Sequence, residues 1–213
     1  WGFYMRDNVL CVVIAGLMLF LPFSALAGGF DNDNVTRDAY TVAFVVYESD
    51  GLEYREGIIN QSVASNHTVE LIDDDDVGSV DLSVYDVVLW SDDGLQPHIR
   101  DLITYKGLNV VLLGDALNDI STIYGGISSW EGSEANATIT ETHPVVAGFD
   151  EGSNAILSRE MKYLERTPYL DHLDEGGMIA VGEPNGRVVA VGAISDIYSD
   201  GFDIIDNSIR WAA

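Results

Sequence analysis

The sequence predicts an α/β domain built around a mainly parallel sheet. Three apolar runs at 41–47 (TVAFVVY), 85–90 (YDVVLW) and 110–113 (VVLL) have the composition of strands that are covered on both faces. Segments 52–65 and 97–105 lie between these runs and predict helices with one apolar side. Strands that alternate with helices at this spacing form βαβ units with right-handed crossovers.

The other elements follow from shorter patterns. Residues 68–72 (TVELI) predict one more strand, and 177–181 and 187–191 predict a hairpin joined by the turn sequence Glu-Pro-Asn-Gly at 183–186. Short extended segments are expected at 137–140, 154–157 and 163–164, the last two in a subsidiary sheet. A helix is expected at 202–213. No repeat of 20–50 residues is visible.

The segment that follows the 110–113 strand is the first candidate site. Gly114 ends the strand in a tight turn, and a helix is expected to begin at 115–119. Many α/β enzymes carry a nucleophile at such a strand–turn–helix junction, and the residue at this tip is Asp115. An aspartate that begins a helix is favoured as a cap for the free N–H groups. The alternative is a carboxylate nucleophile for a phosphoryl or glycosyl centre.

Polar residues gather where the predicted parallel strands end. In such sheets the ligand crevice lies beyond the carboxyl ends of the strands, so these residues are expected to line one rim. The predicted rim comprises Glu48, Asp50, Ser91, Asp92, Asp93, Gly94 and Asp115. Asp92 and Asp93 are weak candidates for a hard-cation site with oxygen ligands. Because acidic loops occur throughout the chain, the sequence favours no metal.

Neither calcium nor a nucleotide cofactor is expected. The four consecutive carboxylates at 73–76 lack the alternate ligand spacing of an EF-hand, so a solvated loop is the favoured interpretation. No G-x-G-x-x-G segment or phosphate-binding loop follows the first strand, where Glu48 and Asp50 would repel phosphate.

His143 is a weak candidate for a catalytic residue. The ordinary pKa of histidine suits a general base near neutral pH. A histidine that precedes proline, as His143 precedes Pro144, is more simply explained as fixing a loop through a bond to a backbone carbonyl.

Composition excludes several classes of function. The 213 residues carry 35 acidic and 10 basic side chains, a net charge of −25, which repels nucleic acid and anionic membrane surfaces. Solubility at high salt is the favoured interpretation, and a cation-binding surface is the alternative. The single cysteine, Cys11, lies in an apolar N-terminal segment. A domain without that segment would have no disulfide, thiolate nucleophile or cysteine-bound zinc.

The N-terminal pattern predicts export. A short charged start, an apolar run at 9–23 and a small-residue end at 24–28 predict a signal peptide at 1–27, cleaved after Ala27. The alternative is an uncleaved anchor, through which alone the chain would contact a membrane. A flexible lead-in is expected at 28–40 and the α/β domain at 41–213. The Asn-x-Ser/Thr acceptors at Asn34, Asn60, Asn66 and Asn136 predict a glycosylated outer surface.

Four segments together resemble a known family. They are LLGDA at 112–116, THPVVAGF at 142–149, NGRVVAVG at 185–192 and DNSIRWAA at 206–213. In this order they are similar to the class I glutamine amidotransferase-like superfamily, and within it to the trehalose-utilisation-type branch. The resemblance covers roughly 41–213. It implies a flavodoxin-like three-layer sandwich with helices on both faces of a mainly parallel sheet.

The resemblance breaks at the catalytic positions. Active members carry a cysteine at the turn and a histidine followed by a glutamate after a late strand. Here the turn carries Asp115, and 192–196 after the late strand contains no histidine. His143 precedes two strands that should come before the missing histidine. Ammonia release from glutamine through a cysteine thioester is therefore excluded.

Two hypotheses of function follow. The first is an exported, non-catalytic amidotransferase-like domain at the cell surface that binds a small polar ligand such as a sugar, or a surface-protein partner. The second is an exported carbohydrate-acting hydrolase or isomerase that uses Asp115, His143 and the Asp92–Asp93 loop. The second requires these groups to converge within hydrogen-bond reach, directly or through one water.

Overall fold

The computed structural model describes residues 39–46, 52–91, 103, 106–119, 129–132, 136–183 and 185–213. The chain divides into two units, Trp1–Val35 and Thr36–Ala213. The described residues all belong to the second unit, and the expected signal peptide lies outside them. No described helix has the length and apolar character that crossing a membrane requires.

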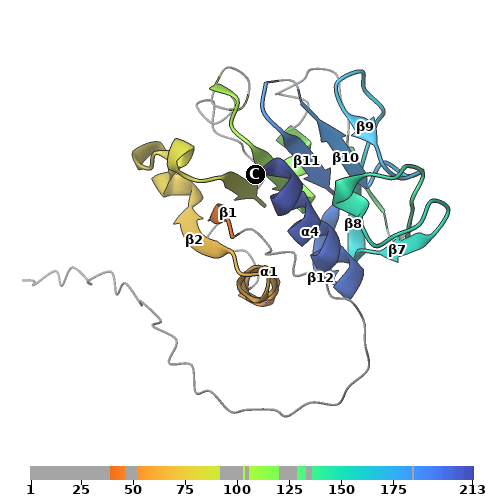
Figure 1. Ribbon diagram of the computed structural model, residues 1–213, viewed down its shortest axis with the longest axis horizontal. Coiled ribbons are helices and arrows are strands. Elements are labelled where there is room, and N and C mark those ends of the chain that lie inside the picture. Colours follow the sequence, from red (N-terminus) through yellow and green to blue (C-terminus); the bar gives the residue numbers. More distant parts are fainter. Residues whose placement is uncertain are drawn as a thin grey trace, which may run out of the picture. The chain divides into compact units, whose positions relative to one another are not determined.

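Seven strands form the central sheet in the order β2-β1-β3-β4-β11-β10-β9 (Figure 1). The five strands from β2 to β11 are parallel to their neighbours, β10 is antiparallel to β11, and β9 is antiparallel to β10. This arrangement confirms the predicted α/β fold with a mainly parallel sheet. The strands are β1 (Thr41–Val46), β2 (Thr68–Asp73), β3 (Val87–Trp90), β4 (Val110–Leu113), β9 (Asp171–His172), β10 (Ile179–Gly182) and β11 (Val188–Val191).

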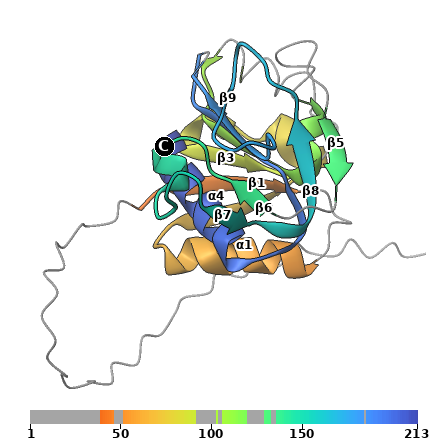
Figure 2. The same ribbon diagram turned by 90° about the vertical axis from the view of Figure 1, so that its right-hand side faces the viewer.

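The central strands are buried on both faces, as their apolar runs predicted. In β1, Phe44 and its even-numbered neighbours pack on the face that also buries Ile58 of α1 (Leu52–Ala64) and Ile204 of α4 (Ser199–Ala212). Figure 2 shows these two helices on the same side of the sheet. Val45 points to the other face, where it joins Leu82 in a second core. Side chains that alternate between two cores explain why the strands contain almost no polar residues.

Two smaller antiparallel sheets complete the fold. The first has the order β12-β8-β5, with β5 (Ser129–Gly132), β8 (Ser158–Leu164) and β12 (Ala193–Ile197). The second pairs β6 (Asn136–Thr138) with β7 (Asn154–Ile156). The short strand expected at 163–164 is thus the end of a seven-residue strand. The predicted hairpin is present as β10 and β11.

Several predicted boundaries are corrected. The carboxylates expected in a solvated loop at 73–76 instead end β2 and begin a 3-10 helix, η1 (Asp74–Ser79), which the Asp73 side chain caps at the Asp75 N–H. A second 3-10 helix, η2 (Leu82–Val84), follows. The third strand begins at Val87 instead of residue 85. The last helix begins at Ser199 instead of residue 202. The helix expected at 97–105 lies mostly outside the described residues.

Candidate functional site

The chain turns sharply after β4, and the residue that allows this turn is Gly114. Gly114 has φ +50, a left-handed conformation that glycine adopts without steric cost. The chain then forms a 3-10 helix, η3 (Gly114–Asp119), where an α-helix was expected. Residues three apart eclipse one another in a 3-10 helix, so Asp115 and Asn118 share one face. This face meets β8.

A buried lysine on β8 binds both of these side chains. The Lys162 Nζ donates to Asp115 Oδ1 at 2.7 Å and to Asn118 Oδ1 at 3.1 Å. The Lys162 side chain is 3% exposed, whereas the Asp115 side chain is 48% exposed. A buried ammonium requires an anionic partner, and Asp115 supplies it. The Asp115 carboxylate thus binds this ammonium, and not the helix N–H groups that the sequence suggested.

The backbone of β8 approaches the backbone at Gly192 closely, and this contact fixes the position of Lys162. The Lys162 N–H donates to the Gly192 carbonyl oxygen at 2.6 Å, and a Cβ at position 192 would overlap the Lys162 carbonyl oxygen. Glycine at this position thus allows β8 to cross the end of β11. Sequence reasoning did not find Lys162, since lysine usually marks a solvated position.

The rest of the predicted rim is only partly described. Trp90 of β3 pairs with Leu112 of β4, so Ser91 and Asp115 follow adjacent strands at the same edge of the sheet. The Ser91 side chain is buried, and its hydroxyl lies 3.5 Å from the Val45 carbonyl oxygen. Five other predicted rim residues lie outside the described residues: Glu48, Asp50, Asp92, Asp93 and Gly94.

His143 has a local structural role. Its Nδ1 accepts a hydrogen bond from the Val145 N–H at 3.2 Å, which caps the 3-10 helix η4 (Pro144–Val146). The expected bond to a backbone carbonyl is thus replaced by a bond to a backbone amide. Burial lowers the pKa of His143, which favours the neutral ring that this acceptor role needs.

The contacts of His143 show that it lies far from Asp115 in the direction of the strands. Its ring meets Trp211 edge-on at 5.0 Å between centroids, and the Arg187 guanidinium lies 5.4 Å from the centroid of the same indole. Arg187 immediately precedes Val188, which pairs with Val110, the first residue of β4. Asp115 follows the last residues of β4. The structure therefore places His143 and Asp115 at opposite ends of the sheet and does not bring them together.

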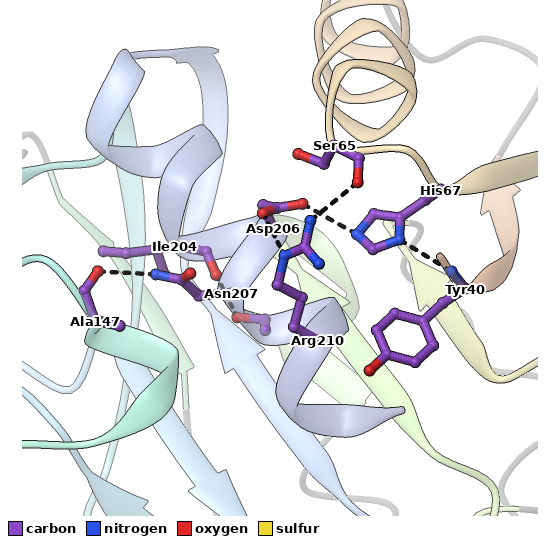
Figure 3. A network of polar contacts seen from close by, with 9 residues as sticks. Tyr40, Ser65, His67, Ala147, Ile204, Asp206, Asn207 and Arg210 are labelled. Carbon is purple, nitrogen blue, oxygen red and sulfur yellow. Dashed lines mark hydrogen bonds and ion pairs between the residues drawn. The ribbon is translucent and has the colours of Figure 1, made fainter. Parts of the chain in front are cut away.

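A second ionic cluster, which sequence reasoning missed, lies just before β2 (Figure 3). The His67 Nδ1 accepts from the Tyr40 N–H at 3.2 Å, and its Nε2 lies 3.1 Å from Asp206 Oδ1. Arg210 donates from Nε to Asp206 Oδ2 at 2.9 Å and from Nη2 to the Ser65 carbonyl oxygen at 3.0 Å. Since Nδ1 is an acceptor, Nε2 carries the proton and donates to Asp206. Burial lowers the pKa of His67, in accord with a neutral ring.

Two of the segments that carry the family resemblance also meet each other. Asn207 on α4 donates from Nδ2 to the Ala147 carbonyl oxygen at 3.0 Å (Figure 3). His143 and Trp211 form a second contact between the same two segments. The THPVVAGF and DNSIRWAA segments thus join η4 to α4, which is a packing role.

Among the described residues, no group of three or more His, Cys, Asp or Glu side chains could hold a metal ion. The weak metal candidates Asp92 and Asp93 lie outside those residues. A shallow cavity of about 320 Å³ lies at the other end of the sheet from Asp115, beside the start of β11. Its lining includes Asn109, Glu183 and Arg187.

Comparison with known proteins supports the fold. No protein-family model matches the sequence, and no curated protein matches it. The structure is similar to a glutamine amidotransferase from Thermotoga maritima, with a TM-score of 0.51 and 11% sequence identity over 75% of this chain and 76% of that chain. The chain has a class I glutamine amidotransferase-like fold. At this identity the likeness describes the fold alone.

Proposed function

We propose that this chain is an exported, non-catalytic amidotransferase-like domain that binds a small polar ligand at the cell surface. Its binding edge is the one that carries Asp115 and Ser91, at the carboxyl ends of the parallel strands. The motif segments at 142–149 and 206–213 support a place in the trehalose-utilisation-type branch. Export rests on the apolar, small-residue-ended segment at 9–28.

The Asp115–Lys162 ion pair carries the proposal. In catalytic relatives of the kind the sequence resembles, this turn presents a cysteine thiolate. Here it presents a carboxylate held by a buried ammonium. A carboxylate cannot form the thioester through which a cysteine releases ammonia. His143, the histidine that the alternative enzyme hypothesis needs as its base, lies at the opposite end of the sheet.

The same pair indicates the class of ligand. The Lys162 ammonium holds the Asp115 carboxylate in place, and about half of the Asp115 side chain remains open to solvent. An exposed carboxylate with a fixed orientation accepts hydrogen bonds from hydroxyl groups. A sugar or another polyhydroxy compound presents such donors, whereas an anion would meet a strongly acidic protein.

Thermal denaturation tests the proposal. At fixed high salt, a panel of neutral sugars and divalent cations is added to the protein, and a specific ligand raises Tm in step with its concentration. The Asp115→Asn variant should lose this shift. The Asp203→Asn variant, changed at an exposed position on α4, should retain it. A shift that survives in Asp115→Asn would place binding elsewhere.

Two activity assays complete the test. Incubation with glutamine should release no ammonia above the rate of the Asp115→Asn variant. Incubation with the sugar that raises Tm should return it unchanged. Turnover in either assay that Asp115→Asn abolishes would overturn the non-catalytic assignment and favour the hydrolase or isomerase.

A further inference from the structure

Three of the four Asn-x-Ser/Thr acceptors lie in the described part of the chain, and they differ in conformation. The asparagines Asn60, Asn66 and Asn136 are all exposed. Exposure alone does not distinguish them. A transferase must reach the asparagine amide and the hydroxyl two residues later at the same time, so the relative direction of these two groups decides which acceptor is usable once the domain has folded.

The acceptor at Asn60 is divided between two sides of a helix. Asn60 and Ser62 lie in α1, where residues two apart do not face each other. Asn60 is exposed, whereas Ser62 is 2% exposed. An enzyme that binds the Asn60 amide in the folded domain cannot also reach the Ser62 hydroxyl.

The acceptor at Asn136 is held in a strand. Its hydroxyl residue, Thr138, donates from Oγ1 to Asn154 Oδ1 at 2.9 Å. Asn136 and Thr138 also pair with β7 along the ladder between the two strands. Binding this acceptor in an enzyme would require separation of β6 from β7.

The acceptor at Asn66 begins in a turn and ends at Thr68, the first residue of β2, whose N–H donates to the Tyr40 carbonyl oxygen at 2.8 Å. Asn66 has φ +71, a left-handed conformation that asparagine tolerates better than most residues. Both Asn66 and Thr68 are exposed. Within the described part of the chain, neither the Asn66 amide nor the Thr68 hydroxyl has a hydrogen-bond partner.

The neighbours of Asn66 are held from inside the protein. The His67 N–H donates to the Ser62 carbonyl oxygen at 2.9 Å, and the His67 ring binds Asp206. On the other side of Asn66, the Ser65 carbonyl oxygen accepts from Arg210. Figure 3 shows Ser65 and His67 directed toward Arg210 and Asp206 of α4. The residues that flank Asn66 thus anchor the turn and leave Asn66 itself facing solvent.

From these contacts we infer that Asn66 is the one of the three acceptors in the described part of the chain that is N-glycosylated once the domain has folded, a conclusion that rests on the proposed export. The donor is a polyprenyl-phosphate- or polyprenyl-diphosphate-linked oligosaccharide. The Asn66 Nδ2 attacks the anomeric carbon, a carbon–nitrogen bond forms, and the bond from that carbon to the phosphate oxygen breaks. One amide proton is lost, and the lipid phosphate or diphosphate leaves with the bonding electron pair.

The position of Asn66 is compatible with the proposed binding edge. Asn66 lies just before Thr68, which pairs with Thr41 at the start of β1. It therefore lies at the amino ends of the parallel strands, and Asp115 lies at the carboxyl ends. A glycan on Asn66 would therefore leave the proposed binding edge open.

Glycopeptide mass spectrometry of the full chain, isolated from the cells that produce it, tests the inference. We expect glycan on the Asn66 peptide and unmodified Asn60 and Asn136 peptides. Thr68→Ala should abolish the glycan while it leaves Asn66 in place, and Thr68→Ser should retain it. Asn60→Gln and Asn136→Gln are the matched controls and should leave glycan mass unchanged.

Fractionation of the same cells separates the two proposals. Protein found outside the membrane with an unmodified Asn66 would overturn the glycosylation site and leave export standing. Equal glycan occupancy at Asn60 would show that transfer precedes folding and would overturn the selection of Asn66 by conformation. Retention of the whole chain in the cytoplasm would overturn export and glycosylation together.

Discussion

The two ionic clusters of this domain lie at opposite ends of the parallel strands and are built differently. At the carboxyl ends, the buried Lys162 binds Asp115, whose side chain is 48% exposed. At the amino ends, Asp206 is 11% exposed and binds both His67 and Arg210. Lys162 holds a carboxylate at the surface, whereas Asp206 joins α4 to the segment just before β2 through His67. An ion pair beside the sheet can therefore keep a carboxylate exposed at one end of the strands and join separate segments at the other.

Loss of the Asp206 carboxylate should have the largest effect on stability. Asp206→Ala leaves Arg210 without its carboxylate and removes the acceptor for His67 Nε2, and breaking a buried pair in this way costs about 3 kcal/mol. Urea denaturation measures the change in the free energy of unfolding. Asp203→Ala, at an exposed position of the same helix, should change it by less than about 0.5 kcal/mol. Equal effects for the two variants would contradict the tertiary role.

The Asp115–Lys162 pair should show an asymmetric response. Asp115→Ala removes the carboxylate that binds the buried Lys162 ammonium and should cost about 1–2 kcal/mol, reduced because Asp115 is half exposed. Lys162→Met keeps an apolar chain of similar length and leaves Asp115 to water, so it should cost less. The double variant should recover most of the loss caused by Asp115→Ala alone.

An exposed pair supplies the reference for that comparison. Arg159 and Asp196 lie 3.1 Å apart with side chains 66% and 54% exposed. Arg159→Ala should change stability by no more than about 0.5 kcal/mol, since solvent screens such pairs. If Asp115→Ala costs no more than Arg159→Ala, the burial of Lys162 has no energetic consequence and the proposed asymmetry fails.

The smallest effect should appear in the dependence of stability on pH. Burial, the largest cause, holds the pKa of His67 below 6.5 in the folded state, so the unfolded chain binds more protons as the pH falls. The contribution of His67 is therefore complete above pH 6.5 and is lost as the pH falls through the folded pKa. Between about pH 7.5 and pH 5, the protein should lose more stability than His67→Gln. Urea denaturation at several pH values measures this loss. If stability fell equally with pH in the protein and in His67→Gln, His67 would have the same pKa in the folded and unfolded states, which would contradict the prediction.

The elements that the sequence predicted correctly are those with a continuous local pattern. The apolar runs of β1 and β4 and the hairpin of β10 and β11 depend on neighbouring residues, and the structure confirms each. The prediction was wrong where side chains compete with helix hydrogen bonds. The aspartates at 73–76 formed a 3-10 helix capped by Asp73 instead of a loop.

The candidate site was harder to predict because its partners are distant in sequence. Asp115 was singled out from the turn that carries it, but its partner Lys162 lies 47 residues later. Nothing in the pattern SREMKYL marks Lys162 as buried. His67 and Asp206 are 139 residues apart. The local signal in that cluster was the four-residue spacing of Asp206 and Arg210, which allows an ion pair on one helix face.

The order of strands in the central sheet has a consequence for synthesis. β4 pairs with β3 on one side and with β11 on the other, and β11 begins at Val188, 75 positions after β4 ends at Leu113. Until Val188–Val191 leaves the ribosome, one edge of a fully apolar strand has no native neighbour. Such edges pair with other chains, and strands joined over long sequence separations close slowly. The many acidic side chains of the nascent chain repel other copies during this interval.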